Sequence, residues 1–306
     1  MADPKRIFIS GASGFVGRHL IAALTRACPD AALFTGSVDV RDPHAVLTAV
    51  REAAPDACVH LAGIASPVQA RSEPDLAWQV NLMGTLNLAR AVLAEAPSCR
   101  FLFVSTSEVY GASFRPGTPL DETAVLAPMN TYAATKAAAD LAVGAMVNEG
   151  LRAIRVRPFN HTGPGQTDAY VVPAFAQQLV RIGIGLQPPA MKVGALQPAR
   201  DFVDVRDICA AYVGCLTRPD SVLPPGTILN LASGSPRRIG DVLNDLCRIA
   251  GVTPAIESDT GLLRPSDIVI ARGDSSLAHR LLGWAPRIAW EQTLTDVLDD
   301  WRGRVS

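Results

Sequence analysis

The sequence predicts an α/β protein with a doubly wound parallel sheet and a smaller C-terminal lobe. In the first half of the 306-residue chain, short apolar segments alternate with longer segments whose apolar residues recur at helical spacing. Strands that alternate with helices form βαβ units, and these units build parallel sheets. After Asn160 the alternation gives way to segments dense in proline and glycine, at 161–166 and 187–198. The length fits one sizeable domain with a second lobe attached to it.

The expected elements of the first half follow one another in the order of a βαβ fold. The predicted strands are Arg6–Ser10, Ala32–Thr35, Ala57–Ala62, Phe101–Ser105 and Ala153–Arg157. The predicted helices are Val16–Arg26, Pro43–Ala53, Leu76–Glu95 (as one helix or two) and Tyr132–Asn148. Proline favours the first helical position, which Pro43 would occupy. The segment from Pro29 to Asp39 is too short for two strands and their connection, so we expect one strand to be curtailed or missing.

In the second half of the sequence we expect fewer helices and strands. Its expected helices are Val172–Ile182, Ile239–Ile249 and Gln292–Trp301, and its expected strand is Ile228–Leu231. We expect residues 1–162 to form the first unit, with returning segments near 201–235, and residues 163–306 to form mainly the smaller lobe. The sequence contains no linker and no repeat, so the two units should enclose a cleft.

The composition narrows the class of protein. The 28 Lys and Arg residues nearly cancel the 29 Asp and Glu residues, whereas nucleic-acid binders usually carry a basic excess. No apolar segment has the length of a membrane span, and no signal-peptide pattern is present. The six cysteines form no Cys-x-x-Cys pair, and no grouping of residues has metal-ligand spacing. These features predict a cytoplasmic protein with no nucleic-acid, membrane or metal partner.

A glycine-rich segment lies between the first predicted strand and the first predicted helix. Its glycines allow the backbone to turn sharply and approach a pyrophosphate, while the N–H groups at the start of the helix face the anion. This position near the N-terminus predicts a dinucleotide site of the Rossmann type. The candidate cofactor-binding residues of this segment are Gly11, Ser13, Gly14, Phe15, Val16 and Gly17.

The second predicted strand lacks the acidic residue that normally binds the adenosine ribose. The strand is followed by Gly36-Ser37, and Asp39 comes slightly later, in a better position for the adenine. Both NADP(H) and NAD(H) therefore stay open as cofactors, and the missing acid favours NADP(H) slightly. Arg18 and Arg41 are the nearest candidates for a partner of the 2′-phosphate.

Tyr132 and Lys136 are four residues apart on a predicted helix and share one of its faces. An ammonium beside a phenol favours the phenolate, so we expect Lys136 to lower the pKa of Tyr132 from its usual value of about 10. The segment Ser105-Thr106-Ser107-Glu108 closes the preceding strand, at the carboxyl edge of the sheet where doubly wound folds bind ligands. A hydroxyl there could hold a substrate oxygen beside the tyrosine.

This combination of motifs resembles the extended short-chain dehydrogenase/reductase family. The segments that carry the resemblance are Gly11–Gly17, Asp39-Val40, His60–Gly63, Asn81 within Asn-Leu-Met-Gly-Thr, Ser105–Gly111 and Tyr132–Lys136. The resemblance implies that Tyr132 is the acid–base residue at a sugar carbon oxygen, that Lys136 holds the nicotinamide ribose, and that Thr106 orients the substrate oxygen. It places Glu108 with these catalytic candidates and Ser107 at the substrate. It also adds four residues to the cofactor site: Val40, Leu61, Ala62 and Gly63.

The second lobe is similar to enzymes that act on GDP-hexoses. The similar segments are Arg157–Gln166, Val193-Gly194, Arg200-Asp201-Phe202, Leu263–Asp267 and Leu282–Pro286. Arg200 and Arg264 can each offer a guanidinium fork to a diphosphate, and the Asn160 amide can bridge the sugar or the phosphate. The resemblance therefore implies a GDP-sugar as the substrate.

Three activities stay open within this resemblance. They are reduction of the C4 ketone of GDP-4-keto-6-deoxy-D-mannose to GDP-D-rhamnose by NAD(P)H, 4,6-dehydration of GDP-mannose, and 4-epimerisation of a nucleotide sugar. Glu108 suits a dehydratase, which uses such a residue to move the C5 proton, but some reductases keep it. The short chain and the curtailed segment before Asp39 favour the reductase. A redox sensor without catalysis would not need Tyr132 and Lys136.

The resemblance also implies a homodimer, in which the helices Leu82–Glu95 and Tyr132–Asn148 pair across the interface.

Overall fold

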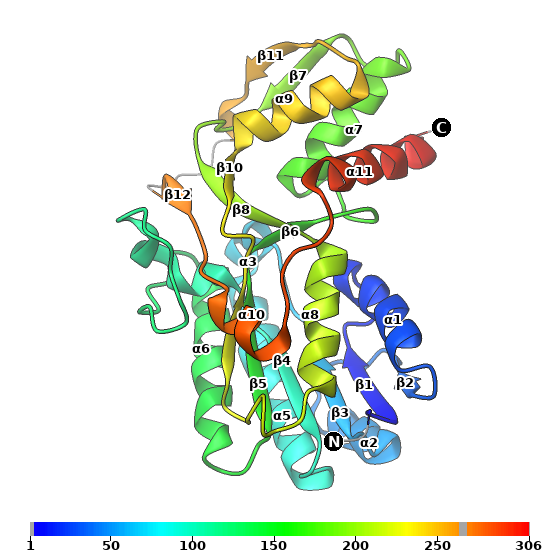
Figure 1. The fold of residues 1–306 in the computed structure, drawn as a ribbon, viewed down its shortest axis with the longest axis vertical. Helices are drawn as coiled ribbons and strands as arrows, with labels where there is room; N and C mark the ends of the chain where they lie inside the picture. The colour runs from blue at the N-terminus through cyan, green and yellow to red at the C-terminus, as the bar shows by residue number, and fades with distance from the viewer. Residues whose placement is uncertain (1–2, 263–267, 306) are drawn as a thin grey trace.

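A six-stranded parallel sheet forms the centre of the first unit in the computed structural model, which describes residues 3–262 and 268–305 (Figure 1). The strand order is β2-β1-β3-β4-β5-β9, and all neighbours run parallel. The strands are β1 (Arg6–Ser10), β2 (Ala32–Phe34), β3 (Ala57–His60), β4 (Arg100–Val104), β5 (Ala153–Pro158) and β9 (Ile228–Leu231). The predicted α/β fold with a doubly wound parallel sheet is confirmed.

Alternate residues of each strand point to opposite faces of the sheet. Both faces are apolar here, and helices cover both of them. Ile7 and Ile9 of β1 pack in one apolar cluster with α1 (Phe15–Ala27) and α8 (Val205–Thr217). Phe8 packs on the opposite face, with the helices α2 (Pro43–Ala53), α5 (Gly84–Glu95) and α6 (Thr131–Val147). Because both faces are covered, the strands are almost continuously apolar, as expected for a parallel sheet.

The second strand is curtailed, as the sequence predicts. β2 has three residues and pairs only with β1, and residues 35–42 lead to α2 without another strand. The Asp42 side chain caps α2 by accepting hydrogen bonds from the His44 and Ala45 amides, and Pro43 follows at the first helical position. The sheet order reverses between β1 and β3, so the crevice where this fold binds ligands opens at the carboxyl ends of these strands.

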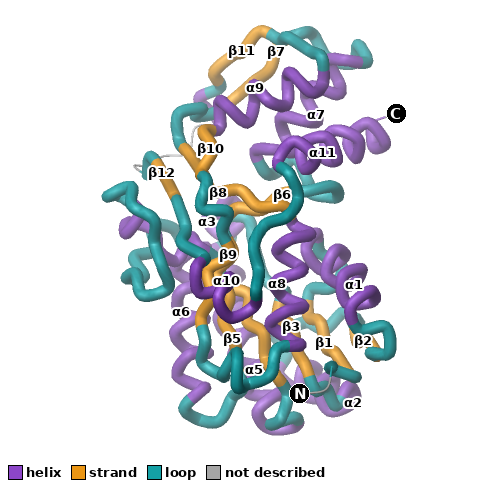
Figure 2. The backbone as a smooth tube through the Cα atoms, in the orientation of Figure 1, coloured by secondary structure: helices purple, strands orange, loops and turns teal. Residues whose placement is uncertain are grey.

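The second lobe lies beyond the carboxyl edge of the large sheet (Figure 2). One of its sheets contains β6 (Asn160–Thr162), β8 (Ala199–Asp204), β10 (Pro236–Arg238) and β12 (Ile270–Ala271). The other pairs β7 (Ala190–Val193) with β11 (Ala255–Ser258), followed by the short 3₁₀ helix η3 (Thr260–Leu262). An apolar core joins three helices of this lobe: α7 (Val171–Gly183), α9 (Ile239–Ala250) and α11 (Trp290–Val305).

The chain returns to the first unit after β8. Helix α8 and strand β9 join the large sheet, and α10 (Ser276–Leu282) packs in the same apolar cluster. Trp284 supports this return by donating from Nε1 to the Asp207 carbonyl oxygen at 2.8 Å. These contacts place α8, β9 and α10 with the first unit, whereas β6 and β8 belong to a sheet of the second lobe.

The predicted helix Leu76–Glu95 is interrupted in the structure. It begins as α4 (Pro74–Trp78), widens into the π-helical segment η1 (Gln79–Met83), and continues as α5. The cause is Asn81, whose amide accepts from the Ile64 N–H at 2.8 Å and donates to the Ile64 carbonyl at 3.1 Å. Two further short helices, absent from the sequence prediction, are α3 (Pro67–Ser72) and η2 (Ser107–Phe114).

Within the part of the chain that the structure describes, no helix is both long and apolar enough to span a membrane.

Candidate active site

The nucleotide loop, residues 11–17, has the close backbone packing that a dinucleotide site needs. Gly11 has φ +74°, and a Cβ there would lie 2.6 Å from the Ala62 nitrogen. A Cβ on Gly17 would lie 2.4 Å from the Ala12 carbonyl oxygen. The first turn of α1 carries no acidic residue, so its N–H groups face an anion without a competing carboxylate. The loop therefore fits the pyrophosphate of a dinucleotide.

A loop of the second lobe docks against the nucleotide loop and α1. Arg18 donates to the Ser13 carbonyl at 3.1 Å and to the Gly165 carbonyl at 3.0 Å, so it bridges the two loops. The Phe15 ring lies parallel to the His161 ring, with the centroids 6.4 Å apart. Val16, the next residue of the loop, packs on the core of the large sheet. The sequence prediction considers Arg18 for a 2′-phosphate, but its guanidinium already binds two carbonyls.

Asp39 and Val40 lie between β2 and α2. The Asp39 carboxylate pairs with the Arg41 guanidinium at 2.6 Å, and these hydrogen bonds hold the pKa of Asp39 at about 2. Arg41 is therefore engaged by an acid of its own loop. Val40 is buried against α5, where a Cβ on Gly84 would lie 2.5 Å from the Val40 Cγ2.

A series of buried hydrogen bonds begins at Ser10, the last residue before the nucleotide loop. The Ser10 hydroxyl bonds to His60 Nδ1 at 2.6 Å, and His60 Nε2 bonds to the Thr85 hydroxyl at 2.9 Å. The Thr85 hydroxyl donates its proton to the Asn81 carbonyl, so it accepts from Nε2–H and His60 accepts at Nδ1. Burial lowers the pKa of His60 to about 3, which keeps the ring neutral.

This series of hydrogen bonds continues from Asn81 to helix α6, since the Asn81 amide donates to the Thr135 hydroxyl at 3.0 Å. Leu61, Ala62 and Gly63 lie between these two ends: the Leu61 amide donates to the Ser10 carbonyl, and a Cβ on Gly63 would approach Asn81 Oδ1 to 3.0 Å. The sequence prediction places all three at the cofactor; in the structure the backbone of Leu61 and Ala62 lies against Gly11 of the nucleotide loop.

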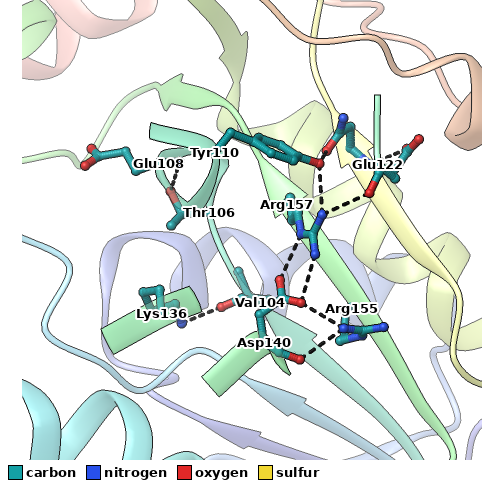
Figure 3. Close-up of polar contacts among 10 residues, drawn as sticks. Val104, Thr106, Glu108, Tyr110, Glu122, Lys136, Asp140, Arg155 and Arg157 are labelled. Carbon is teal, nitrogen blue, oxygen red and sulfur yellow. Dashed lines mark hydrogen bonds and ion pairs between the residues drawn. The ribbon is translucent and has the colours of Figure 1, made fainter. Parts of the chain in front are cut away.

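The structure brings Thr106, Tyr132 and Lys136 together at the carboxyl edge of the sheet. Thr106 is the second residue after β4 and caps η2 by accepting from the Glu108 amide at 3.2 Å. The Thr106 hydroxyl is within hydrogen-bonding reach of the Tyr132 phenol. Lys136 lies one turn after Tyr132 on α6, where its ammonium donates to the Val104 carbonyl at 2.6 Å (Figure 3). The same ammonium lies over the Phe103 ring, 4.6 Å from its centroid.

The expected lowering of the Tyr132 pKa is wrong for this structure. Burial and the neighbouring Glu108 carboxylate raise the pKa of Tyr132 above its ordinary value, although the hydrogen bond with Thr106 opposes them. The Lys136 ammonium is bonded to a carbonyl instead, and burial lowers its own pKa to about 8. Tyr132 therefore retains its proton at neutral pH.

Glu108 lies beside both Tyr132 and Arg200. Its carboxylate accepts from Asn130 Nδ2 at 3.1 Å, and Asn130 also caps α6. The charge of Glu108 raises the pKa of Tyr132 and also favours the charged form of Arg200, whose pKa burial lowers. Ser107, another predicted substrate residue, is buried at the start of η2.

The predicted phosphate-binding residues come from the second lobe. Arg200 lies on β8 and donates to the Ala199 and Ile268 carbonyls at 2.9 and 3.2 Å. Asn160 lies on β6, in register with Phe202 of β8, and is exposed. Arg264, the second predicted guanidinium, lies outside the described residues.

The next residue on β8, Asp201, supports the turn beside Arg200. Its fully buried carboxylate accepts hydrogen bonds from the Ser233 hydroxyl and from the Ser233 and Gly234 amides. The sequence prediction did not assign this role, because Ser233 lies 32 residues away.

The fold and the order of the sequence motifs define a protein of the extended short-chain dehydrogenase/reductase class. Within that class the chain belongs to the GDP-mannose 4,6-dehydratase family, whose sequence profile matches residues 27–297.

Full-length relatives refine this placement. The chain is 36% identical to the GDP-6-deoxy-D-mannose reductase of Pseudomonas aeruginosa, over 98% of each chain. It is 28% identical to the GDP-6-deoxy-D-talose 4-dehydrogenase of Aggregatibacter actinomycetemcomitans, over 91% of each.

Solved structures agree with the fold. The structure of RMD from Pseudomonas aeruginosa complexed with NADPH superposes with a TM-score of 0.90 at 36% identity, covering 98% of this chain and 99% of that chain. A UDP-glucose 4-epimerase of Thermus thermophilus in complex with NAD gives a TM-score of 0.83 at 26% identity, covering 97% and 99%.

Proposed function

We propose that this protein reduces the C4 ketone of GDP-4-keto-6-deoxy-D-mannose to give GDP-D-rhamnose. The observation that carries the proposal is the meeting of Thr106, Tyr132 and Lys136 at the edge of the sheet, beside a loop shaped for a dinucleotide. The full-length similarity to a GDP-6-deoxy-D-mannose reductase supports the choice of substrate.

The side chains divide the work of a ketone reduction. A reduced nicotinamide supplies the hydride when it is bound. Tyr132, protonated at neutral pH, gives its proton to the oxygen that develops at C4. The Thr106 hydroxyl orients that oxygen, and the Lys136 ammonium stabilises the phenolate that remains and holds the nicotinamide ribose. Holding these groups in one geometry supplies much of the acceleration.

The cofactor we propose is NADP(H) or NAD(H), with NADP(H) favoured. Residues 35–37 after β2 contain no acid that would repel a 2′-phosphate. The Pseudomonas aeruginosa relative is solved with NADPH, whereas the Thermus thermophilus epimerase is solved with NAD. Gly11, Gly14 and Gly17 would hold the pyrophosphate in either case.

GDP-mannose 4,6-dehydration is the second candidate function, because Glu108 lies beside Tyr132. Dehydration needs a C5 proton removed and returned, and Glu108 is the carboxylate of this motif that could do so. Its carboxylate is held by Asn130, and a reductase needs no base at C5. This difference makes Glu108 the position at which the two functions separate.

We also propose a cytoplasmic homodimer. Apolar side chains stay exposed on α4, η1 and α6, among them Trp78, Met83 and Leu141. These three elements contact one another, so they can offer one surface to a second copy. All six cysteines are free thiols, which suits a reducing compartment.

A thermal-shift panel of nucleotide sugars, followed by product analysis, tests the proposed function. GDP-4-keto-6-deoxy-D-mannose or GDP should raise the melting temperature more than the matched UDP and dTDP compounds. With NADPH, the keto sugar should then give GDP-D-rhamnose. A larger shift with UDP-sugars, and no turnover of the GDP-keto sugar, would contradict it.

A further inference from the structure

Two separate elements carry the proposed catalytic side chains. Tyr132 and Lys136 lie on α6, whereas Thr106 and Glu108 lie at the start of η2. The 3₁₀ helix η2 is interrupted at Gly111, where φ is +45°. Short 3₁₀ segments are intrinsically weak, so η2 depends on tertiary contacts for its position.

A buried arginine behind the site contacts both elements. Arg157 of β5 binds the Asp140 carboxylate of α6 through two parallel hydrogen bonds, from Nε at 2.9 Å and from Nη2 at 3.0 Å. Its third nitrogen, Nη1, donates to the Tyr110 hydroxyl of η2 at 3.1 Å (Figure 3). Asp140 and Tyr110 are fully buried, and Arg157 is 3% exposed.

The Tyr110 hydroxyl both accepts and donates a hydrogen bond in this arrangement. It accepts from Arg157 and donates to Asn230 Oδ1 of β9 at 2.7 Å. Burial raises the pKa of Tyr110, so the hydroxyl keeps the proton that it donates. Nη1 of Arg157 also donates to the Glu122 carbonyl at 3.2 Å, which fixes the loop after η2. Such a planar fork with several fixed acceptors locks direction as well as distance, which a lysine could not do.

We propose that Arg157 and Tyr110 are positioning residues that set the catalytic turn η2 against the catalytic helix α6. We call Asp140, Arg157 and Tyr110 the clamp. Tyr110 is four residues from Thr106 and Asp140 is four residues from Lys136, so the clamp joins the two elements next to their catalytic side chains. This inference rests on the proposed reductase function, because its consequence is measured as turnover.

The same carboxylate provides a matched control. Arg155 of β5 also pairs with Asp140, through Nη1 to Oδ1 at 2.9 Å and to the Asp140 carbonyl at 3.1 Å. The hydrogen bonds of Arg155 go to α6 and not to η2. An Arg155→Gln variant therefore removes a buried ion pair with Asp140 and leaves the link to η2 in place, whereas Tyr110→Phe cuts that link and leaves both ion pairs.

The experiment compares these two variants with the wild type. Amide hydrogen exchange of residues 107–114 is measured without cofactor. Steady-state reduction of the GDP-keto sugar is measured with NADPH and with 4-deuterated NADPH. For Tyr110→Phe we expect faster exchange, an unchanged KM for NADPH, a kcat lower by about tenfold and a larger isotope effect, because misplaced groups slow the chemical step. For Arg155→Gln we expect a lower melting temperature, wild-type exchange at 107–114 and a kcat within about twofold.

Two results would overturn the inference. One is wild-type kcat and isotope effect in Tyr110→Phe, whatever the exchange. The other is an equal loss of kcat in Arg155→Gln, which would show that general destabilisation is the cause. If the wild type does not reduce the keto sugar, the proposed function fails, and equal exchange of residues 107–114 in Tyr110→Phe and wild type would then reject the clamp separately.

Discussion

Replacing Lys136 with methionine should stabilise the cofactor-free protein while removing its activity. Lys136 is buried, and burial lowers its pKa from about 10.5 to about 8. Each unit of pKa shift corresponds to about 1.4 kcal/mol, so burying the Lys136 ammonium destabilises the folded state by about 3 kcal/mol at pH 7. Methionine fills a similar volume without a charge. It loses the hydrogen bond to the Val104 carbonyl, which offsets about 1–2 kcal/mol. A net gain of about 1–2 kcal/mol should remain.

The stability that Lys136→Met gains over the wild type should decrease as the pH rises. Below pH 8 Lys136 is charged in both the folded and the unfolded protein, so the wild type bears the full cost of burying the charge. Between about 8 and 10.5 the unfolded chain holds the proton more tightly than the folded protein, so wild-type stability rises with pH relative to the variant. The advantage of Lys136→Met should therefore shrink as the pH approaches 10.5.

Urea unfolding of both proteins at pH 7 and pH 10, without cofactor, measures the two effects. Comparing the variant with the wild type at each pH cancels the titration of all other groups. The reasoning is refuted if Lys136→Met is less stable than the wild type at pH 7, or if the difference between the two proteins is the same at pH 10. Either result would mean that the Lys136 ammonium is not held at a cost in the folded protein.

Four further predictions concern the site. Tyr132→Phe should lower kcat by about 10²–10⁴-fold, since it removes the proton donor. Glu108→Gln should stay within about tenfold of wild type, or 1.4 kcal/mol of barrier, in the same NADPH-consumption assay; a complete loss would favour the dehydratase. Arg200→Ala should weaken GDP binding by about 1.5–3 kcal/mol in calorimetry, and unchanged affinity would remove Arg200 from the diphosphate site. Parallel titrations should show tighter binding of NADPH than of NADH; NADH binding at least about tenfold tighter would contradict the cofactor preference.

Elements with strong local signals could be predicted from the sequence. The boundaries of α2 agree with the prediction, because Asp42 supplies the cap and the next residue, Pro43, favours the first helical position. The strand β9, Ile228–Leu231, also agrees. The motifs at residues 11–17, 105–108 and 132–136 lie where the prediction places them, at the carboxyl edge of one sheet.

Features that depend on distant partners could not be predicted. The π-helical turn at Asn81 is held by Ile64 and Thr135, which lie 17 and 54 residues away. Helix α8 is a different case: its buried residues Val205, Ile208, Tyr212 and Leu216 recur at helical spacing, so the prediction missed a signal that the sequence contains. Arg157 meets Tyr110 across 47 residues, and a lone arginine before a proline carries no signal of that contact.

The stoichiometry and position of hydride transfer test the central claim most directly. The wild-type protein is incubated with GDP-4-keto-6-deoxy-D-mannose and 4-deuterated NADPH, and in parallel with GDP-mannose and NADP⁺. We predict that one cofactor is oxidised for each keto sugar consumed, that the deuterium is found at C4 of GDP-D-rhamnose, and that GDP-mannose is unchanged. Conversion of GDP-mannose to the 4-keto sugar with no net change of cofactor would contradict the account.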